Sequence, residues 1–288
     1  MSRMLMTCAF VGLLGVNSVQ AATLDISIAA QGAAYDNMVA DAKLRGDGGG
    51  GIEDANLGAG AGSGSVNRIY ANFLLDGTTP SGRLNTFVQR FDVSSIPAGS
   101  TINSATLTQY FSNQTANNRT FVDLKLSQLQ PGKAWTEGVS QNPATDGSVT
   151  WNSQVAGPTP ETTTLWATPG ATSASDIVLA TTQTFDLVGV DGTATAIIRD
   201  ITPWVQDWVN NPANNTGMLW WGGNSADSAS GNRYFMFGVK EDGAGPAGDA
   251  AFAAPTLVID YIPVPEPGAI ISLSAGLLTL IACRRKVS

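Results

Sequence analysis

Histidine is absent from the 288 residues, and cysteine occurs only twice, as Cys8 and Cys283, inside the two apolar end segments. The lack of histidine removes the commonest general base and the commonest nitrogen ligand for metals. Without cysteine, the region between the end segments can form neither a disulfide nor a zinc–cysteine site. Ser-His-Asp and Cys-His catalysis are therefore excluded, and the packed core alone must hold the fold.

Charged residues are scarce, at 13% of the chain, against a usual share of about 25%. The net charge is −8, but the end segments contain Arg3, Glu266, Arg284, Arg285 and Lys286. Without these five, 11 basic and 22 acidic residues remain, which gives the region between the ends a net charge of −11. Such a surface repels phosphate backbones, so we expect calcium or a neutral glycan as a partner rather than nucleic acid.

The start of the chain combines the positive Arg3, an apolar run over residues 4–16 and small residues up to Ala21 and Ala22. This order is typical of a secretory signal peptide. We therefore predict a signal peptide over residues 1–22, cleaved after Ala21 or Ala22. The alternative is a buried N-terminal helix.

The other end of the chain has three parts. Residues 264–267 read Val-Pro-Glu-Pro, an apolar run covers residues 269–283, and a basic cluster fills residues 284–286. A helix over this run covers roughly 22 Å, somewhat less than a hydrocarbon core of about 30 Å, but flanking groups can extend the span. We expect a transmembrane helix with its basic end in the cytoplasm.

This tail resembles the PEP-CTERM sorting signal, which we assign to residues 263–288. The residues that carry the resemblance are Pro265, Glu266, Pro267, Arg284, Arg285 and Lys286. The resemblance implies that an exosortase recognises the tail in the inner membrane, cleaves near Pro265 to Pro267 and releases the protein to the cell surface or extracellular matrix. It also implies a Gram-negative host that makes exopolysaccharide. The alternative is a permanent membrane anchor.

Short strand-like runs, separated by Gly, Pro, Asn and Ser, fill the region between the ends. The pattern Val122–Leu126 alternates apolar with charged residues, as expected of a strand with one buried face. We predict an all-β domain over residues 23–262. Its expected strands cover residues 24–29, 67–75, 84–93, 101–111, 120–129, 147–151, 162–168, 184–188, 194–201, 217–221, 233–239 and 255–262.

One short helix interrupts this pattern. Ile201, Trp204, Val205 and Trp208 recur at helical spacing. Thr202 is a suitable N-cap and the next residue, a proline, fits the first helical position. We predict one to two helical turns that close one end of a sandwich, with both tryptophans in the core.

The segment 90–107 reads Arg-Phe-Asp-Val-Ser-Ser-Ile-Pro-Ala-Gly and continues into a second strand. It resembles the hallmark of the DNRLRE domain family, and segments 135–151, 200–208 and 255–261 agree in order. The resemblance implies a jelly-roll-like β-sandwich and a non-catalytic module related to carbohydrate-binding modules for acidic polysaccharides. Unlike those relatives, this chain has glycine-rich insertions, and we expect no attached catalytic domain.

The same segment has a direct physical interpretation. Pro97, Ala98 and Gly99 predict a tight turn between two strands. Arg90 and Asp92 share one face of the first strand, so we expect Asp92 to form a charge pair that fixes the strand end.

Residues 47–64 are rich in glycine, and we predict a loop. Its carboxylate and amide oxygens are ligands that suit calcium, although their spacing matches no known calcium loop. The alternative is a solvated loop without a metal. The calcium candidates are Asp47, Glu53, Asp54 and Asn56.

Exposed aromatic rings could stack on sugars, with polar groups orienting the hydroxyls. The candidates are Trp166, Trp220, Trp221 and Tyr234. Adjacent Trp220 and Trp221 must point to opposite faces of a strand, so one of them could be exposed. The alternative for each is packing in the core or at a sheet edge.

We therefore predict an exported, exosortase-processed protein that binds exopolysaccharide or another glycan and is not an enzyme. A purely structural or adhesive matrix protein is the second hypothesis. A polysaccharide-active enzyme is the third, and it would need paired carboxylates. The possible members of such a pair are Glu137, Asp146, Asp200 and Asp207.

Overall fold

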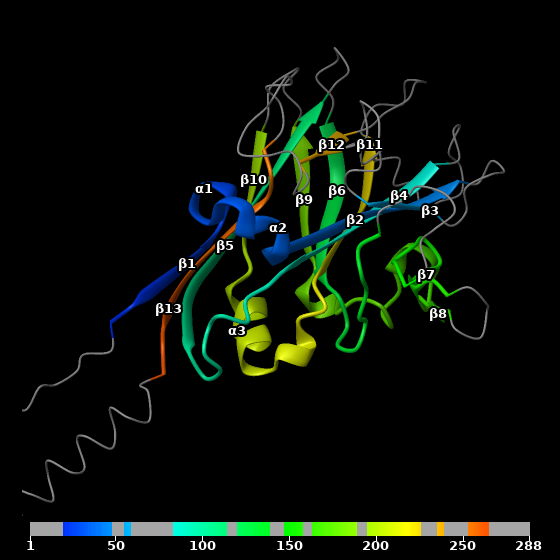
Figure 1. Ribbon diagram of the computed structural model, residues 1–288. Helices are drawn as coiled ribbons and strands as arrows, with labels where there is room; N and C mark the ends of the chain where they lie inside the picture. The colour runs from blue at the N-terminus through cyan, green and yellow to red at the C-terminus, as the bar shows by residue number, and fades with distance from the viewer. Residues whose placement is uncertain are drawn as a thin grey trace, which may run out of the picture.

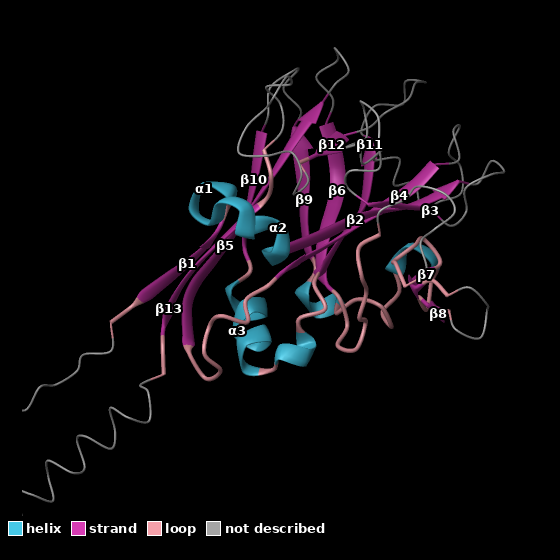
Figure 2. Cartoon of the chain, viewed as in Figure 1, coloured by secondary structure: helices cyan, strands magenta, loops and turns pink. Residues whose placement is uncertain are grey.

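Antiparallel strands make up most of the computed structural model, with short helices at the ends of the sheets (Figures 1 and 2). The structure describes residues 20–47, 55–58, 83–113, 120–138, 147–157, 163–188, 195–225, 235–238 and 253–264. The predicted all-β class is confirmed.

Two sheets carry the fold. In the first sheet the strand order is β1 (Ala22–Ile26), β13 (Thr256–Ile262), β5 (Thr101–Asn113) and β10 (Thr195–Asp200), and β12 (Phe235–Phe237) also pairs with β5. In the second sheet the order is β3 (Ala55–Gly58), β2 (Val39–Asp47), β4 (Arg83–Phe91), β11 (Met218–Ser225), β6 (Thr120–Gln128) and β9 (Gln183–Val188). A separate hairpin joins β7 (Ser153–Val155) to β8 (Thr164–Leu165).

The two sheets enclose the main hydrophobic core, which we call the sandwich core. The first sheet contributes Leu107 and Ile259, and the second contributes Phe87, Leu126 and Trp220, all at most 1% exposed. The alternation predicted for residues 122–126 is confirmed, since Leu124 and Leu126 are buried while Asp123 is exposed. Burial of these apolar side chains is the main source of stability for the sandwich.

A second hydrophobic core lies on the opposite face of the second sheet, and we call it the outer core. Leu44, Val88 and Leu219 form its sheet side, and all three are fully buried. The segment between β6 and β9 covers them with irregular backbone, the β7–β8 hairpin and two short 3-10 helices, η3 (Pro169–Ala171) and η4 (Leu179–Thr181). The central strands of the second sheet are therefore buried on both faces.

The helix α3 (Thr202–Asn210) closes the lower end of the sandwich in Figure 1, followed by the 3-10 helix η5 (Pro212–Asn214). Trp204 and Trp208 are buried in the sandwich core, as predicted. Thr202 is the first helical residue, and the residue at the N-cap is Ile201. The Thr202 hydroxyl instead accepts the Ala105 N–H (2.8 Å). The Asp200 carboxylate takes the capping role by accepting the Thr202 N–H (2.9 Å).

Four local predictions were wrong. Residues after Ile26 turn into the short helices α1 (Ile28–Gln31), η1 (Gly32–Ala34) and α2 (Tyr35–Met38) instead of continuing a strand. β2 was not predicted at all, because burial on both faces removes the alternation that marks a strand. β3 lies inside the expected glycine-rich loop. Residues 147–151 do not form a strand; they are irregular backbone that packs in the outer core.

The predicted targeting segments lie almost wholly outside the described residues, which begin at Gln20 and end at Val264. Among those residues, no helix combines the length and apolar character needed to cross a bilayer. β1 and β13 pair antiparallel with Ala22 opposite Tyr261, so the two ends of the described chain leave the fold side by side (Figure 1).

Candidate functional site

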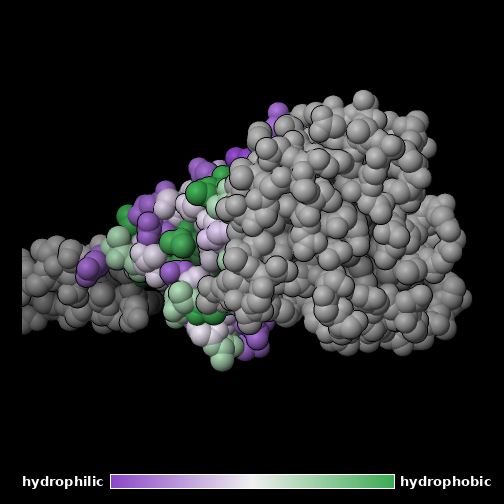
Figure 3. Space-filling model, turned by 90° about the horizontal axis from the view of Figure 1, so that it is seen from above, coloured by the Kyte–Doolittle hydropathy of each residue, from purple (hydrophilic) through white to green (hydrophobic). Residues whose placement is uncertain are grey.

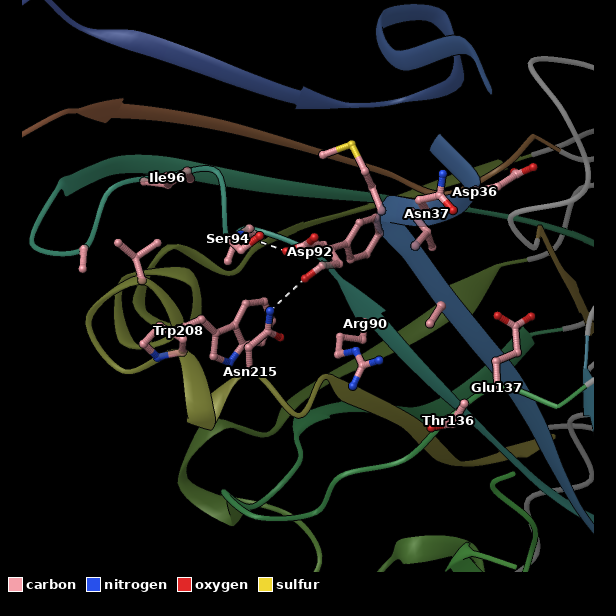
Figure 4. Close-up of a pocket in the computed structure, with 18 of the residues that line it drawn as sticks. Asp36, Asn37, Arg90, Asp92, Ser94, Ile96, Thr136, Glu137, Trp208 and Asn215 are labelled. Atoms are coloured by element: carbon pink, nitrogen blue, oxygen red, sulfur yellow. Dashed lines mark hydrogen bonds between the residues drawn. The ribbon is translucent and has the colours of Figure 1, made fainter. Parts of the chain in front are cut away.

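A cavity of about 640 Å³ lies beside the end of β4 (Figure 4). Its walls come from four places: α2 with the start of β2, the turn after β4, the segment after Trp135, and α3 with η5. These elements are far apart in sequence and meet only in the folded sandwich.

The turn after β4 forms one wall, and its sequence explains its shape. Asp92 Oδ1 accepts the Ser94 N–H at 2.9 Å, which bends the chain as the strand ends. Gly99 then adopts a φ of +82°, a conformation that favours glycine, and the chain enters β5. The predicted tight turn is confirmed, and Asp92 fixes it through this backbone bond.

Arg90 forms the polar middle of the cavity. Its guanidinium lies 5.2 Å from the ring centroid of Trp135, and Nη1 lies 3.5 Å from the Trp135 carbonyl oxygen. Burial lowers the pKa of Arg90 below its ordinary value, and the negative charge of Asp92 partly offsets that effect. The cation is thus held by an aromatic face and a nearby carboxylate.

The cavity has a charged end and an apolar end. In Figure 4, Asp36 and Glu137 lie beyond Arg90 at one end, while Ile96 and Trp208 lie at the other. Asp36 is exposed at the start of α2, and Glu137 is half-buried. Asp92 is the third acidic residue among those that line the cavity.

Two buried polar atoms in the lining lack partners. The Asn215 amide donates to the Phe91 carbonyl oxygen (2.9 Å), but its Oδ1 is buried and accepts no hydrogen bond from the described residues. Trp208 is 1% exposed, and its Nε1 likewise has no acceptor in the described part of the chain. A buried donor and a buried acceptor without partners each cost free energy of folding.

The tryptophans predicted to stack on sugars are not available for that role. Trp166, Trp220 and Trp221 are 4%, 0% and 9% exposed, respectively. Trp220 and Trp221 do point to opposite faces, but Trp220 enters the sandwich core and Trp221 the outer core. Neither ring is exposed, because the second sheet is covered on both sides, so core packing, the alternative given for each of them, is confirmed.

The remaining predicted residues fall in two groups. Asp47 and Asn56 lie on the paired strands β2 and β3, and the described residues contain no group of three or more acidic side chains placed to hold a metal. The others lie outside the described residues: Tyr234, Glu53, Asp54, Asp146, Pro265, Glu266, Pro267, Arg284, Arg285 and Lys286.

The possible catalytic carboxylates do not share one place. Glu137 lines the cavity, whereas Asp200 and Asp207 stabilise α3 and η5. Hydrogen bonds from the Thr202 hydroxyl and backbone N–H lower the pKa of Asp200. Asp207 accepts from the Asn214 amide at 3.0 and 3.1 Å.

Sequence reasoning identified Arg90, Asp92 and the following turn as distinctive, but it did not connect them to a cavity. Trp208 and Asn215 were missed because their polar atoms become notable only when burial leaves them without partners. No periodicity or motif carries that information.

Comparison with known proteins adds no name to this site: no family model matches the chain, and no curated protein does. The resemblances noted in the sequence therefore remain predictions. The function has to be argued from the cavity and from the two ends of the fold.

Proposed function

We propose that this chain is an exported, exosortase-processed protein of the cell surface or extracellular matrix, and that its jelly-roll-like sandwich is a non-catalytic glycan-binding module. The cavity beside β4 is the glycan site in this proposal. The observation that carries it is the combination, in one hollow, of an apolar end and a charged end, with two buried polar atoms in its lining residues that have no partner among the described residues.

The form of the cavity suits a sugar. A pyranose presents C–H groups on its faces and hydroxyls around its edge, so it needs both apolar and hydrogen-bonding walls. Ile96 and Trp208 supply the apolar wall, and Arg90 and the carboxylates supply the polar one. The volume of about 640 Å³ is within the usual range of ligand sites.

The positions of the chain ends support the proposed processing. β1 begins at Ala22, directly at the predicted signal cleavage site, and β13 ends at Ile262, shortly before Pro265. Both end segments can therefore be removed without removing a strand. Cleavage after Ala21 or Ala22 leaves the pairing of β1 with β13 essentially complete.

A purely structural matrix protein is the second proposal, and one observation favours it. All seven tryptophans are buried, so none offers the exposed ring with which many glycan-binding surfaces stack on sugars. The surface seen from above in Figure 3 shows apolar residues scattered among polar ones, without a continuous apolar area in its described part.

Glycan retention separates the two proposals. The full-length chain, solubilised in mild detergent, is passed over immobilised neutral, cationic and anionic glycans with and without calcium. We expect Ala98→Trp, which places a bulky ring at the exposed turn lining the cavity, to abolish retention. Ala174→Trp, at an exposed position outside the cavity, serves as the matched control.

Retention that survives Ala98→Trp would place the site elsewhere, and a lack of retention on every glycan would favour the structural role. The export proposal is tested separately, by mass spectrometry of both termini of the protein recovered from the envelope and the culture fluid. An intact, unprocessed chain in the cytosol would exclude it.

A further inference from the structure

We infer that the end of the sandwich from which both chain ends leave is a membrane-docking surface, and that its partner is the lipid bilayer that holds the C-terminal helix. This inference rests on the proposed function, because it needs residues 269–283 to lie in a bilayer. It adds a contact between the folded domain and the lipid headgroups.

The docking surface, which we call the sheet tip, consists of three segments that meet at this end: residues 20–24, 96–103 and 261–264. β1 pairs with the end of β13, and β13 pairs with β5 so that Ile262 lies opposite Thr101. Val264 continues this contact past the strand, because a Cβ placed on Gly99 would lie 3.3 Å from Val264 Cγ2. The three segments therefore form one surface, at the end where β1 and β13 meet the grey terminal traces in Figure 1.

The first observation is that the sheet tip exposes apolar side chains. Ile262 and Val264 are 41% and 43% exposed, and they are two of the five large apolar residues that are exposed in the described part of the chain. Pro97 and Ala98, in the neighbouring turn, are exposed as well. Exposed apolar groups that gather at one place mark a contact with lipid or protein.

The second observation is that the three segments of the sheet tip contain no charged residue, although the region between the end segments has a net charge of −11. A carboxylate pressed against headgroups would lose hydration, and anionic lipids would repel it. Asp260, which precedes the sheet tip in β13, has its carboxylate held by the hydroxyls of Thr23 (2.6 Å) and Ser104 (3.3 Å). The sheet tip is thus a part of an acidic domain that can lie on lipid.

The third observation is the short distance along the chain from the sheet tip to the predicted membrane helix. The apolar run begins at Ala269, five residues after Val264. Five residues span at most roughly 18 Å when fully extended. The run itself covers roughly 22 Å, less than a hydrocarbon core of about 30 Å, and a short helix draws its flanking residues toward the bilayer. A tether of this length gives the sheet tip a high effective concentration at the bilayer, so a weak contact is enough for docking.

The same observations favour lipid over a second copy of the chain. A stable protein interface buries about 800 Å² on each partner, which needs some 20 residues or more. The sheet tip offers only a few exposed apolar residues, and its tether leads to a bilayer. Docking would hold residues 265–267, the predicted cleavage segment, at the bilayer surface, where an enzyme of the inner membrane can reach it.

The test uses the full-length chain in phosphatidylcholine vesicles that contain a lipid with a nitroxide on its headgroup. Cys8→Ser and Cys283→Ser remove the native thiols, and a fluorophore is attached at Thr101→Cys in the sheet tip or at Thr164→Cys. Thr164 is the matched control, because it is also an exposed threonine in a strand but lies in β8, on the outer-core side of the molecule. We expect the nitroxide lipid to quench the label at residue 101 at least about threefold more than the label at residue 164.

A short tether brings any domain near lipid, so substitutions in the sheet tip must separate docking from tethering. Ile262→Glu should reduce the quenching at residue 101 by about twofold or more, because it introduces a charge into the contact. Ile198→Glu makes the same change at a 60% exposed isoleucine of the same sheet, on β10, and should leave the quenching unchanged. Ile262→Ser removes the apolar group without adding a charge and should also reduce the quenching, which keeps the test valid if the glutamate disturbs the strand.

Equal quenching of the two labels, or quenching that neither Ile262 variant changes, would overturn the inference and leave the membrane anchor intact. Protection of the label at residue 101 that appears only at a high ratio of protein to lipid would assign the sheet tip to a second copy and would overturn it as well. A chain that alkaline buffer extracts from the vesicles has no inserted helix. That result would contradict the membrane anchor and the inference together.

Discussion

The sandwich core and the outer core lie on opposite faces of the same sheet, yet they are held in different ways. The sandwich core joins strands of two sheets. Trp220 Nε1 donates to Gln89 Oε1 within it (3.3 Å), and Trp208 Nε1 has no partner among the described residues. In the outer core one wall is irregular backbone, and the indoles fasten it. Those bonds run from Trp135 to the Thr216 carbonyl (2.8 Å) and from Trp166 to the Thr150 carbonyl (3.0 Å).

The difference between the two cores shows how a wall of irregular backbone is stabilised without the hydrogen-bond ladder of a sheet. Strands satisfy their backbone polar groups in the ladder, so a core between two sheets needs chiefly apolar area. An irregular wall has no ladder and must be fixed by specific side-chain bonds. We therefore expect the sandwich core to set global stability and the outer core to open locally.

Adjacent Trp220 and Trp221 give the sharpest comparison. Trp220→Ala should lower the free energy of unfolding by about 4–5 kcal/mol, because the ring is fully buried and packs edge-on against Phe185 at 6.0 Å. Trp221→Ala should cost only about 2–3 kcal/mol, because the ring is 9% exposed and lies under the Lys125 ammonium at 5.2 Å, which can move to cover the gap. Urea denaturation followed by circular dichroism measures both.

Trp220→Phe and Trp221→Phe provide the same comparison with smaller losses, should an alanine variant fail to fold. Equal costs on the two faces would mean that both cores unfold together. A larger cost at Trp221 would reverse the assignment of global stability to the sandwich core.

The sandwich core was largely predictable from sequence. β5, β6, β10 and β13 were expected within a few residues, since each buries one face and leaves alternating polar residues on the other. The helix at residues 202–210 was also expected, because its apolar residues follow the helical period. These signals are local and need no knowledge of tertiary structure.

The outer core was not predictable in the same way. In β2, Ala42 and Leu44 belong to the outer core, while Val39 and Asp41, which precede them, are buried as well, so the sequence of this strand shows no solvent-exposed face. Trp166 was one of the sugar-stacking candidates in the sequence, with packing in the core or at a sheet edge as its alternative. Its burial depends on Trp135 and Ile177, which meet it only in the folded protein.

The cavity shows the same limit. Arg90 and Asp92 stood out as a motif, but their neighbours Asp36 and Asn215 are distant in sequence and have no motif of their own. The cavity forms because four separate elements pack together in the folded protein. Sequence patterns predict each element but not the tertiary contacts between them.

Asp176 offers a second way to separate the two cores. Its buried carboxylate accepts the N–H groups of Ala167 (2.9 Å) and Thr168 (3.0 Å), the Ser173 hydroxyl (2.8 Å) and the Lys133 ammonium (2.9 Å). Asp176→Asn should cost about 2–3 kcal/mol of local stability, because it removes the ion pair and replaces one acceptor with a donor facing other donors. Hydrogen exchange should rise in the outer-core segments 129–138 and 163–178.

Exchange in β5 and β13 is the internal reference for that experiment, since both strands belong to the sandwich. Unchanged protection there, with faster exchange around Asp176, is the expected result. Equal acceleration in both regions would show one cooperative unit and remove the distinction between the cores.

Acid should weaken the outer core before the sandwich core. We expect this effect to be smaller than those of the tryptophan substitutions and of Asp176→Asn. Burial raises the pKa of Asp176, but the four hydrogen bonds outweigh it, so its pKa lies below the ordinary value. A carboxyl whose pKa is lower in the folded than in the unfolded chain stabilises the fold above its unfolded pKa of about 4, and that contribution is lost as the pH falls through the folded value. The gap in outer-core stability between the native chain and Asp176→Asn, measured by hydrogen exchange, should therefore shrink on acidification below about pH 4. Other carboxylates cancel in this difference, so a gap that stays constant with pH would show that the charge of Asp176 does not fasten the irregular wall.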